Sequence, residues 1–159
     1  MQTAAVTPEI KDRFEGLYRE HGDRLWRSLL LFTGRPEIAS DAAAEAFAQA
    51  IRRGDQIRDP LAWVWRAAFK IASGELAAER RTVELVDEPT DPMLEPVADL
   101  LAALRGLTPH QRASITLHHH AGYSYREIAR ILGSSTSAVG VHIHRAKRLL
   151  RAALEDRDE

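Results

Sequence analysis

A run of basic and hydrogen-bonding side chains near the end of the chain has the chemistry needed to bind a polyanion. Between residues 137 and 151, arginines are interspersed with serine and histidine, and these residues would share one face of a helix. Arginine neutralises phosphate, whereas serine and histidine can hydrogen-bond to base edges. A helix with such a face fits the DNA major groove, although a solvated basic face would look the same. The members of the face are Ser137, Val141, His144, Arg145, Arg148 and Arg151.

Two helix-start signals and a glycine would position this face. Ser124 and Glu127 have the spacing of a capping box, in which each side chain accepts a hydrogen bond from the other residue's backbone N–H. Gly133 supplies the left-handed backbone of a tight turn. The pair Ser134-Ser135 then opens a second helix. Two helices joined in this way predict a helix-turn-helix. The inner positions of the second helix are Val139, Ile143, Ala146 and Leu150.

The composition is that of a globular protein without membrane spans or disulfides. The 159 residues are 45% hydrophobic, and no apolar run approaches the ~20 residues that a membrane span needs. The first residues lack the basic and apolar regions of a secretory signal. The chain has no cysteine, which excludes disulfides, thiolate metal sites and a cysteine nucleophile. We therefore expect a cytoplasmic protein without membrane insertion.

The net charge of −1 conceals an uneven distribution along the chain. Residues 1–81 carry 13 basic and 12 acidic side chains, and residues 82–99 carry six acids and no base. Residues 100–159 carry nine bases and five acids. Phosphate neutralisation is therefore expected from the C-terminal part, and different partners from the other two.

Helical periodicity covers most of the chain, and no strand pattern is present. Three helices are expected at 8–33, 37–53 and 61–81, and a further helix at 110–120 precedes the helix-turn-helix. The three prolines and the acids between 82 and 96 predict an extended linker. The expected fold is all-α, with two small helical domains joined by an acidic, proline-containing linker, at 8–81, 82–97 and 98–155.

Both halves of the chain contain short motifs whose residues recur at fixed spacings. The C-terminal ones are Leu104-x-x-Leu107-x-Pro109-x-x-Arg112, Gly122-x-Ser124-x-x-Glu127-Ile128-Ala129 and Leu132-Gly133-x-Ser135. The N-terminal ones are Phe14-x-x-Leu17-Tyr18, Asp41-x-x-x-Glu45-x-Phe47 and Pro60-Leu61-Ala62-Trp63-Val64-Trp65-Arg66. Together they resemble the extracytoplasmic-function (group IV) sigma factors of bacterial RNA polymerase. The resemblance covers residues 12–81 and 98–153.

The resemblance implies a non-enzymatic protein that lends promoter specificity to core RNA polymerase, under control of an anti-sigma factor and without a cofactor or metal. It implies that the C-terminal domain reads the upstream, minus-35 element through Ser135, Thr136, Ser137, Val141, His144, Arg145 and Arg148. It implies that the N-terminal domain opens the minus-10 element through Asp55, Gln56, Ile57, Arg58, Trp63, Arg66 and Lys70. The core polymerase contact is expected at Asp41, Glu45 and Gln49.

Some positions depart from the family pattern. The recognition helix begins Ala138-Val139-Gly140 where the family usually has Thr-Val-Lys, which removes a base and costs the helix up to ~1 kcal/mol relative to alanine. The second helix has Ala43-Ala44-Glu45 where Val-Gln-Glu is usual, and Lys70 replaces a common asparagine.

Other interpretations remain open at this point. A dimeric helix-turn-helix regulator would need its own dimer surface, and a sigma mimic would bind an inhibitor without reading promoters. An enzyme has no support, because no nucleophile–base pair, phosphate loop or metal-ligand spacing is present. The three consecutive histidines at 118–120 point about 100° apart on a helix, so they favour packing or an inhibitor contact over chelation. Trp63 and Trp65 cannot both face inward, and either could pack in the core.

Overall fold

The structure is a computed structural model that describes residues 5–82 and 91–157. Within those ranges every regular element is helical, with α-helices, two 3-10 segments and one π segment connected by turns, and no strand is present. The all-α fold class is thereby confirmed. None of the helices in the described part is long and apolar enough to cross a membrane.

Three long helices make up the N-terminal half: α1 (Pro8–Thr33), α2 (Pro36–Arg53) and α3 (Pro60–Thr82). Thr7 caps α1 by accepting a hydrogen bond from the Ile10 N–H at 3.3 Å, and Gly34 ends it in a left-handed conformation with φ 68°. Alanines fill the inner face of α2, so that it packs closely against both neighbours. The fully buried side chains of this half include Phe14, Leu25, Leu29, Ala39, Ala46, Ala50, Trp65 and Ala68.

The connection between α2 and α3 is short and ordered. A 3-10 turn, η1 (Gly54–Gln56), follows α2 directly. Asp59 then caps α3, because its Oδ1 accepts a hydrogen bond from the Ala62 N–H at 3.2 Å. Pro60 at the first helical position needs no hydrogen-bond partner for its nitrogen.

The linker differs from the extended form expected. Residues 83–90 lie outside the described residues. The following segment, η2 (Pro92–Val97), is a 3-10 helix whose N-terminus is capped by Asp91, since Asp91 Oδ1 accepts from the Met93 N–H at 3.0 Å. Leu94 is buried. The prediction of an extended chain is therefore wrong for 92–97.

The C-terminal half contains α4 (Ala98–Arg105), α5 (Pro109–Ile115), α6 (Tyr125–Leu132) and α7 (Thr136–Glu155). The single α-helix expected at 110–120 is interrupted. Its second part is a π-helical segment, η3 (Thr116–His120), in which the Ala121 N–H bonds to the Thr116 carbonyl at 3.1 Å. π segments are rare and occur often at functional positions.

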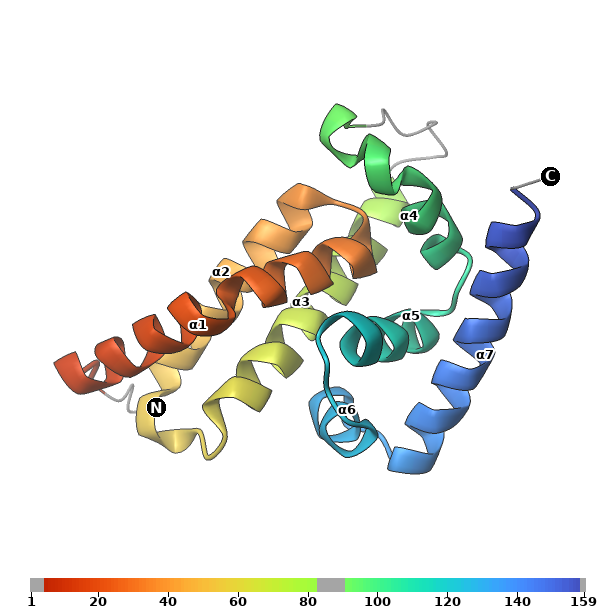
Figure 1. Cartoon of the computed structure of the whole chain (residues 1–159). Helices are drawn as coiled ribbons and strands as arrows, with labels where there is room; N and C mark the ends of the chain where they lie inside the picture. Colours follow the sequence, from red (N-terminus) through yellow and green to blue (C-terminus); the bar gives the residue numbers. More distant parts are fainter. Residues whose placement is uncertain (1–4, 83–90, 158–159) are drawn as a thin grey trace.

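The two halves pack against each other along α1 and α3 (Figure 1). The Trp65 ring of α3 meets the Tyr123 ring edge-on, with centroids 5.1 Å apart. Arg24 of α1 donates a hydrogen bond to the Ala121 carbonyl at 3.1 Å. Neither the Trp65 Nε1 nor the Tyr123 hydroxyl has a hydrogen-bond partner among the described residues, although both are buried. This seam between the halves is therefore partly polar and incompletely satisfied.

A buried arginine links three segments across the same seam. Arg112 of α5 is 2% exposed and donates to the carbonyls of Leu104, Leu107 and Phe32, each at 3.0 Å. Phe32 lies near the end of α1 and Leu104 near the end of α4, where helix carbonyls carry partial negative charge. Burial lowers the pKa of Arg112, and nearby Arg80 and Arg105 lower it further. Backbone carbonyls at the helix ends thus accept the hydrogen bonds of Arg112 in place of an acidic side chain.

Candidate nucleic-acid interface

The helix-turn-helix is built as the spacing predicts. Ser124 Oγ accepts from the Glu127 N–H and Glu127 Oε1 accepts from the Ser124 N–H, both at 3.2 Å. Gly133 turns the chain with φ 66°, and Ser135 Oγ accepts from the Ala138 N–H at 3.1 Å to start α7. The apolar positions lock the two helices together. The buried ones are Ile128, Ile131, Val139, Ile143 and Ala146.

The outer face of α7 is open to solvent in the arrangement expected for a recognition helix. Val141 is 46% exposed, so an apolar contact surface for a base methyl group is present beside the polar side chains. Among the described residues, neither Arg145 nor Arg148 forms an ion pair with an acid. Their charges are therefore available for phosphate. The exposed members are Ser135, Thr136, Ser137, Val141, His144, Arg145 and Arg148.

Gly140 is not part of this outer face. It is half-buried, and a Cβ placed there would lie 3.6 Å from the Tyr125 ring of α6. Position 140, where the family usually has a lysine, thus lies at the edge of the contact between α7 and α6. The charge of the outer face therefore comes from the exposed arginines.

A second candidate surface lies on α3 and the α2–α3 connection. Trp65 is fully buried, which leaves Trp63 as the half-buried ring at the surface, with the Arg53 guanidinium 5.4 Å from its centroid. A hollow of about 510 Å³ is lined by Arg53, Trp63, Arg66 and Lys70 among others. An aromatic ring surrounded by cations can stack on a base while holding the backbone. Sequence reasoning missed Arg53, although its place in the last turn of α2, next to the loop, was a usable signal.

The connection itself contributes a smaller hollow of about 250 Å³ next to the first. Gln56 and Arg58 line it and are exposed, as is Asp55 next to them in the chain. Ile57 is not, because its side chain is only 8% exposed and packs in the core. In this conformation Ile57 anchors the loop and lines the hollow from its buried side, and the expectation that it contacts DNA stays a prediction.

The helix-turn-helix covers part of this second surface. Arg130 of α6 lines the smaller hollow, and its Nη1 lies 3.5 Å from Asp59 Oδ2. Arg66 Nη2 lies 3.3 Å from the position that a Cβ on Gly133 would take. In this arrangement the turn of the helix-turn-helix sits against the α2–α3 loop.

The polar face of α2 carries two exposed acids, one of which is paired with an arginine of the same helix. Asp41 and Glu45 are exposed and Gln49 is half-buried. Gln49 Nε2 donates to Glu45 Oε1 at 2.9 Å and Arg52 Nη2 lies 3.2 Å from the same oxygen. These two contacts hold the pKa of Glu45 below its usual value of 4.5. The face therefore presents a fixed, ionised carboxylate.

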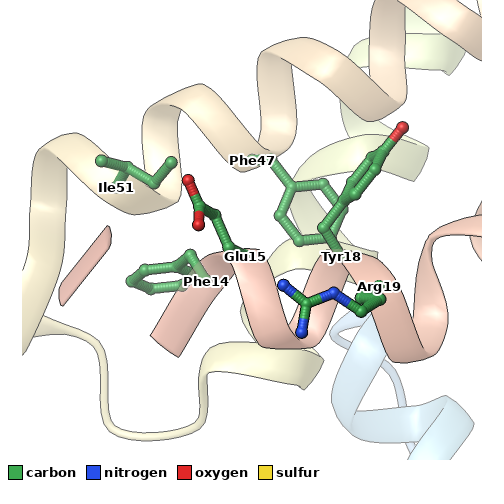
Figure 2. A pocket seen from close by; sticks show the side chains of 6 residues that line it. All are labelled: Phe14, Glu15, Tyr18, Arg19, Phe47 and Ile51. Carbon is green, nitrogen blue, oxygen red and sulfur yellow. The ribbon is translucent and has the colours of Figure 1, made fainter. Parts of the chain in front are cut away.

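An apolar groove runs between α1 and α2 beside that face (Figure 2). Tyr18 is 60% exposed, and its ring meets Phe47 edge-on with centroids 5.2 Å apart. Glu15 and Arg19 of α1 border the groove. The α2 face and the groove together form a surface with an apolar part and a charged part.

Of the three histidines at 118–120 in the π segment, the His118 and His119 rings meet edge-on, with centroids 4.9 Å apart. His118 Nδ1 is 2.8 Å from the Tyr123 carbonyl, and its ring packs edge-on against Tyr125. Burial lowers the pKa of His119 and of His120, with Lys147 adding to the effect at His119 and Arg27 at His120. Within 5–82 and 91–157, no group of three or more potential ligands could hold a metal ion. For His118 the packing interpretation agrees with these contacts.

Comparison with protein families and solved structures gives matches over nearly the whole chain. The family described as Sigma-70, region 4, matches residues 98–150. The ECF RNA polymerase sigma factor BldN of Streptomyces coelicolor is 31% identical over 91% of the chain, which spans 61% of that relative's length. The RNA polymerase sigma-E factor of Streptomyces avermitilis is 32% identical over 91% of the chain and 87% of the relative.

Solved structures agree in fold. CnrH, solved in complex with the cytosolic domain of CnrY, superposes with a TM-score of 0.75 at 27% identity, over 94% of this chain and 91% of CnrH. The sigma factor RpoE of Bartonella quintana, solved with the anti-sigma factor NepR, gives 0.73 at 18% identity, over 91% and 98% of the two chains. The chain therefore belongs to the extracytoplasmic-function sigma factors of bacterial RNA polymerase.

Proposed function

We propose that this chain binds core RNA polymerase and directs initiation by reading two promoter elements with two separate surfaces. The observation that carries the proposal is that a basic outer face on α7 and an aromatic, basic surface on α3 occur in one chain of this family. A protein with a single DNA-binding module would need only the basic face of α7. The activity is one of binding, carried out in the cytoplasm, and no catalytic step belongs to it.

The upstream, minus-35 element is assigned to α7. Arg145 and Arg148 neutralise phosphates and fix the register of the helix in the major groove. Ser137 and His144 reach base edges, and Val141 provides an apolar contact. Ser135 and Thr136, at the start of α7, present hydroxyls and the helix N-terminus to the backbone phosphates.

The downstream, minus-10 element is assigned to the α2–α3 loop and to α3. Opening a base pair costs a few kcal/mol, which stacking and pocket contacts to the extruded base offset. Trp63 and Arg53 supply a stacking platform with a cation, while Arg66 and Lys70 hold the strand. Asp55, Gln56 and Arg58 have polar groups for the Watson–Crick edge of an extruded base.

The polymerase contact is assigned to α2. Asp41 and Glu45 are exposed on one side of the helix with Gln49 next to them, and this face suits a basic helix of the polymerase. The apolar groove between α1 and α2 adds area that charged side chains alone would not provide.

Promoter reading requires the two halves to separate. The helix-turn-helix packs against the downstream-reading loop, so the two DNA surfaces cannot reach elements that lie apart on a duplex. The Arg130–Asp59 pair is exposed and contributes little, so separation must mainly overcome the Trp65–Tyr123 contact and the buried Arg112–Phe32 hydrogen bond. CnrH was solved with a cytosolic protein domain bound. We propose that an anti-sigma factor controls this chain by holding the closed arrangement.

The test is run-off transcription with purified core polymerase and fragments of the source genome. The chain should start transcripts at a small set of defined positions that core polymerase alone does not use. A chain that binds core polymerase but starts no specific transcript would contradict promoter reading, and a sigma mimic that binds an inhibitor would then account better for the family match.

A further inference from the structure

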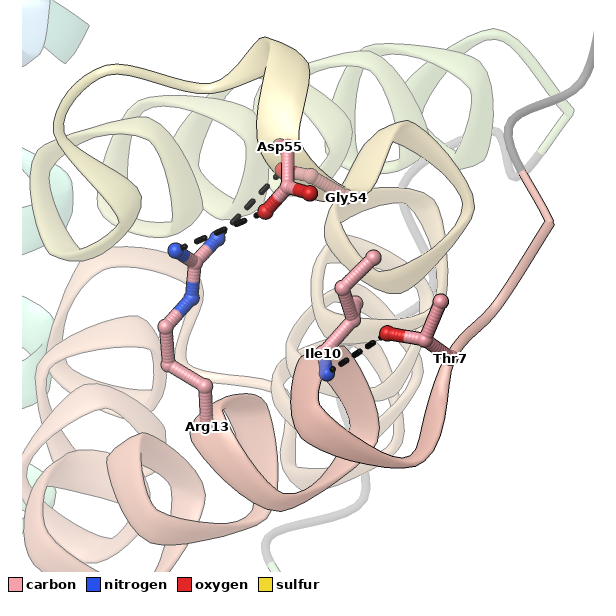
Figure 3. Close-up of polar contacts among 5 residues, drawn as sticks. All are labelled: Thr7, Ile10, Arg13, Gly54 and Asp55. Atoms are coloured by element: carbon pink, nitrogen blue, oxygen red, sulfur yellow. Dashed lines mark hydrogen bonds and ion pairs between the residues drawn. The ribbon is translucent and has the colours of Figure 1, made fainter.

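The loop proposed to read the downstream element is held at its first residue by the start of α1. Gly54 has φ 54° and ψ −123°, a conformation that residues with a side chain rarely adopt. A Cβ at this position would lie 2.9 Å from Ile10 Cδ1. Ile10 is itself buried and fixed, because its N–H bonds to Thr7 Oγ1 (Figure 3). The loop thus begins in close contact with the first turn of α1.

Arg13, on the same side of α1 as Ile10, extends to the loop. Its Nη2 donates a hydrogen bond to the Gly54 carbonyl at 3.4 Å, and its Nη1 lies 3.9 Å from Asp55 Oδ1 (Figure 3). The Gly54 carbonyl also accepts a hydrogen bond from the Ile57 N–H at 3.4 Å. One carbonyl therefore joins Arg13 to the two fixed points of the loop, Gly54 and the buried Ile57.

We propose that Arg13 is a positioning residue for recognition of the downstream element. It holds the exposed side chains of Asp55 and Gln56 in one geometry between Gly54 and Ile57, and it offsets the Asp55 charge where DNA phosphates would approach. This inference rests on the proposed function, and adds to it a residue from α1 that lies 41 positions before the loop it holds.

The solvent exposure of the Arg13–Asp55 pair distinguishes a positioning role from a role in stabilising the fold. The Arg13 side chain is 43% exposed and that of Asp55 is 82% exposed. Ion pairs with this much solvent contribute little to folding. Removing Arg13 should therefore leave the fold intact and change the loop alone. Removing a residue that stabilises the whole fold would not have this limited effect.

The experiment compares holoenzymes that contain the full-length chain or one of its variants. The variants are R13A, R13K and the double variant R13A with D55A. The matched control is K11A, which removes another exposed positive charge of α1, one whose Nζ lies 3.9 Å from Glu15 Oε1. Each holoenzyme is titrated with forked promoter fragments that carry the preferred downstream element, a substituted downstream element or a substituted upstream element.

R13A should lower discrimination at the downstream element by about fivefold or more, the lower end of what one base pair normally supplies. Discrimination at the upstream element should not change. Adding D55A should restore overall DNA affinity without restoring discrimination, and R13K should restore discrimination in part. Amide exchange at Ile57 should be faster in R13A without DNA, while K11A should behave as the original chain.

Unchanged downstream discrimination in R13A would overturn the inference, as would an equal loss in K11A. A different failure is also recognisable. If the original chain itself shows no preference at the downstream element, the proposed function falls and this inference falls with it.

Discussion

Replacing Arg145 and Arg148 together with alanine should weaken upstream binding and reduce its dependence on salt. Both guanidinium groups lie on the exposed face of α7, and neither has an acidic partner among the described residues. Each is therefore expected to release one condensed counterion when it binds a phosphate. The double variant should retain its fold, because the side chains that hold α7 in place are on its opposite face.

The magnitude follows from the number of phosphates lost. The slope of log affinity against log salt changes by about 0.9 for each phosphate contact, so two contacts are worth about 1.8. Over a fourfold salt range, from 50 to 200 mM, this corresponds to a factor of about 12. The affinity deficit of the variant should thus be about 12 times larger at 50 mM than at 200 mM salt.

Fluorescence anisotropy of holoenzyme on a labelled promoter duplex measures both slopes directly. Arg157→Ala is a matched control, because Arg157 belongs to the same half but already pairs with Asp99 at 2.6 Å, beyond the end of α7. Its slope should remain close to that of the original chain. A double variant with an unchanged slope would refute the placement of α7 on DNA.

Three further predictions concern polymerase binding, stability and pH. Charge reversal by Asp41→Lys with Glu45→Lys should weaken core binding at least tenfold, as loss of close charge pairs at an interface does, while the fold is retained; surface plasmon resonance measures this. Gly140→Ala should raise the free energy of unfolding by up to ~1 kcal/mol, because its Cβ would make an ordinary contact with Tyr125; urea denaturation measures this. Burial, with neighbouring His110 and Arg145, lowers the pKa of His142 from 6.5, so the unfolded chain binds this proton more readily. The free energy of unfolding should therefore fall as the pH decreases below about 6.5, and less steeply in His142→Gln.

Each of these has a contrary outcome, and the charge reversal also has a control. Charge reversal at Glu155 and Asp156, at the far end of α7, should leave core affinity unchanged, whereas equal losses in both double variants would place the contact elsewhere. A less stable Gly140→Ala would show that the turn of α7 at this position depends on glycine. Identical pH profiles for His142→Gln and the original chain would assign the acid sensitivity to other groups.

Local signals predict most of the fold. Helix caps such as Ser124 with Glu127 depend on residues three apart, and the turn at Gly133 depends on one residue, so both can be read directly from the sequence. The exposed face of α7 follows from helical periodicity in the same way. The sequence therefore predicts the exposure of all seven candidate residues for the upstream element, and their contact with DNA stays a prediction.

Long-range packing accounts for what could not be predicted. Ile57 belongs to a polar loop by sequence, yet the core has room for its side chain. Arg112 appears as a motif residue, and nothing in the sequence shows that its guanidinium reaches the Phe32 carbonyl 80 positions away. The contact of Arg130 with Asp59 likewise depends on how the halves pack. This last contact places the turn of the helix-turn-helix against the α2–α3 loop, which no local pattern indicates.

Site-specific photocrosslinking in the promoter-bound holoenzyme tests the central claim most directly. A crosslinking side chain at Ser137 of α7 should attach to DNA at the upstream element, and one at Gln56 should attach at the downstream element. The two sites should be separated by the spacing between the elements, and both should be lost when core polymerase is omitted. Attachment of both positions to the same stretch of DNA, or of neither, would contradict the account that one chain reads two elements with two surfaces.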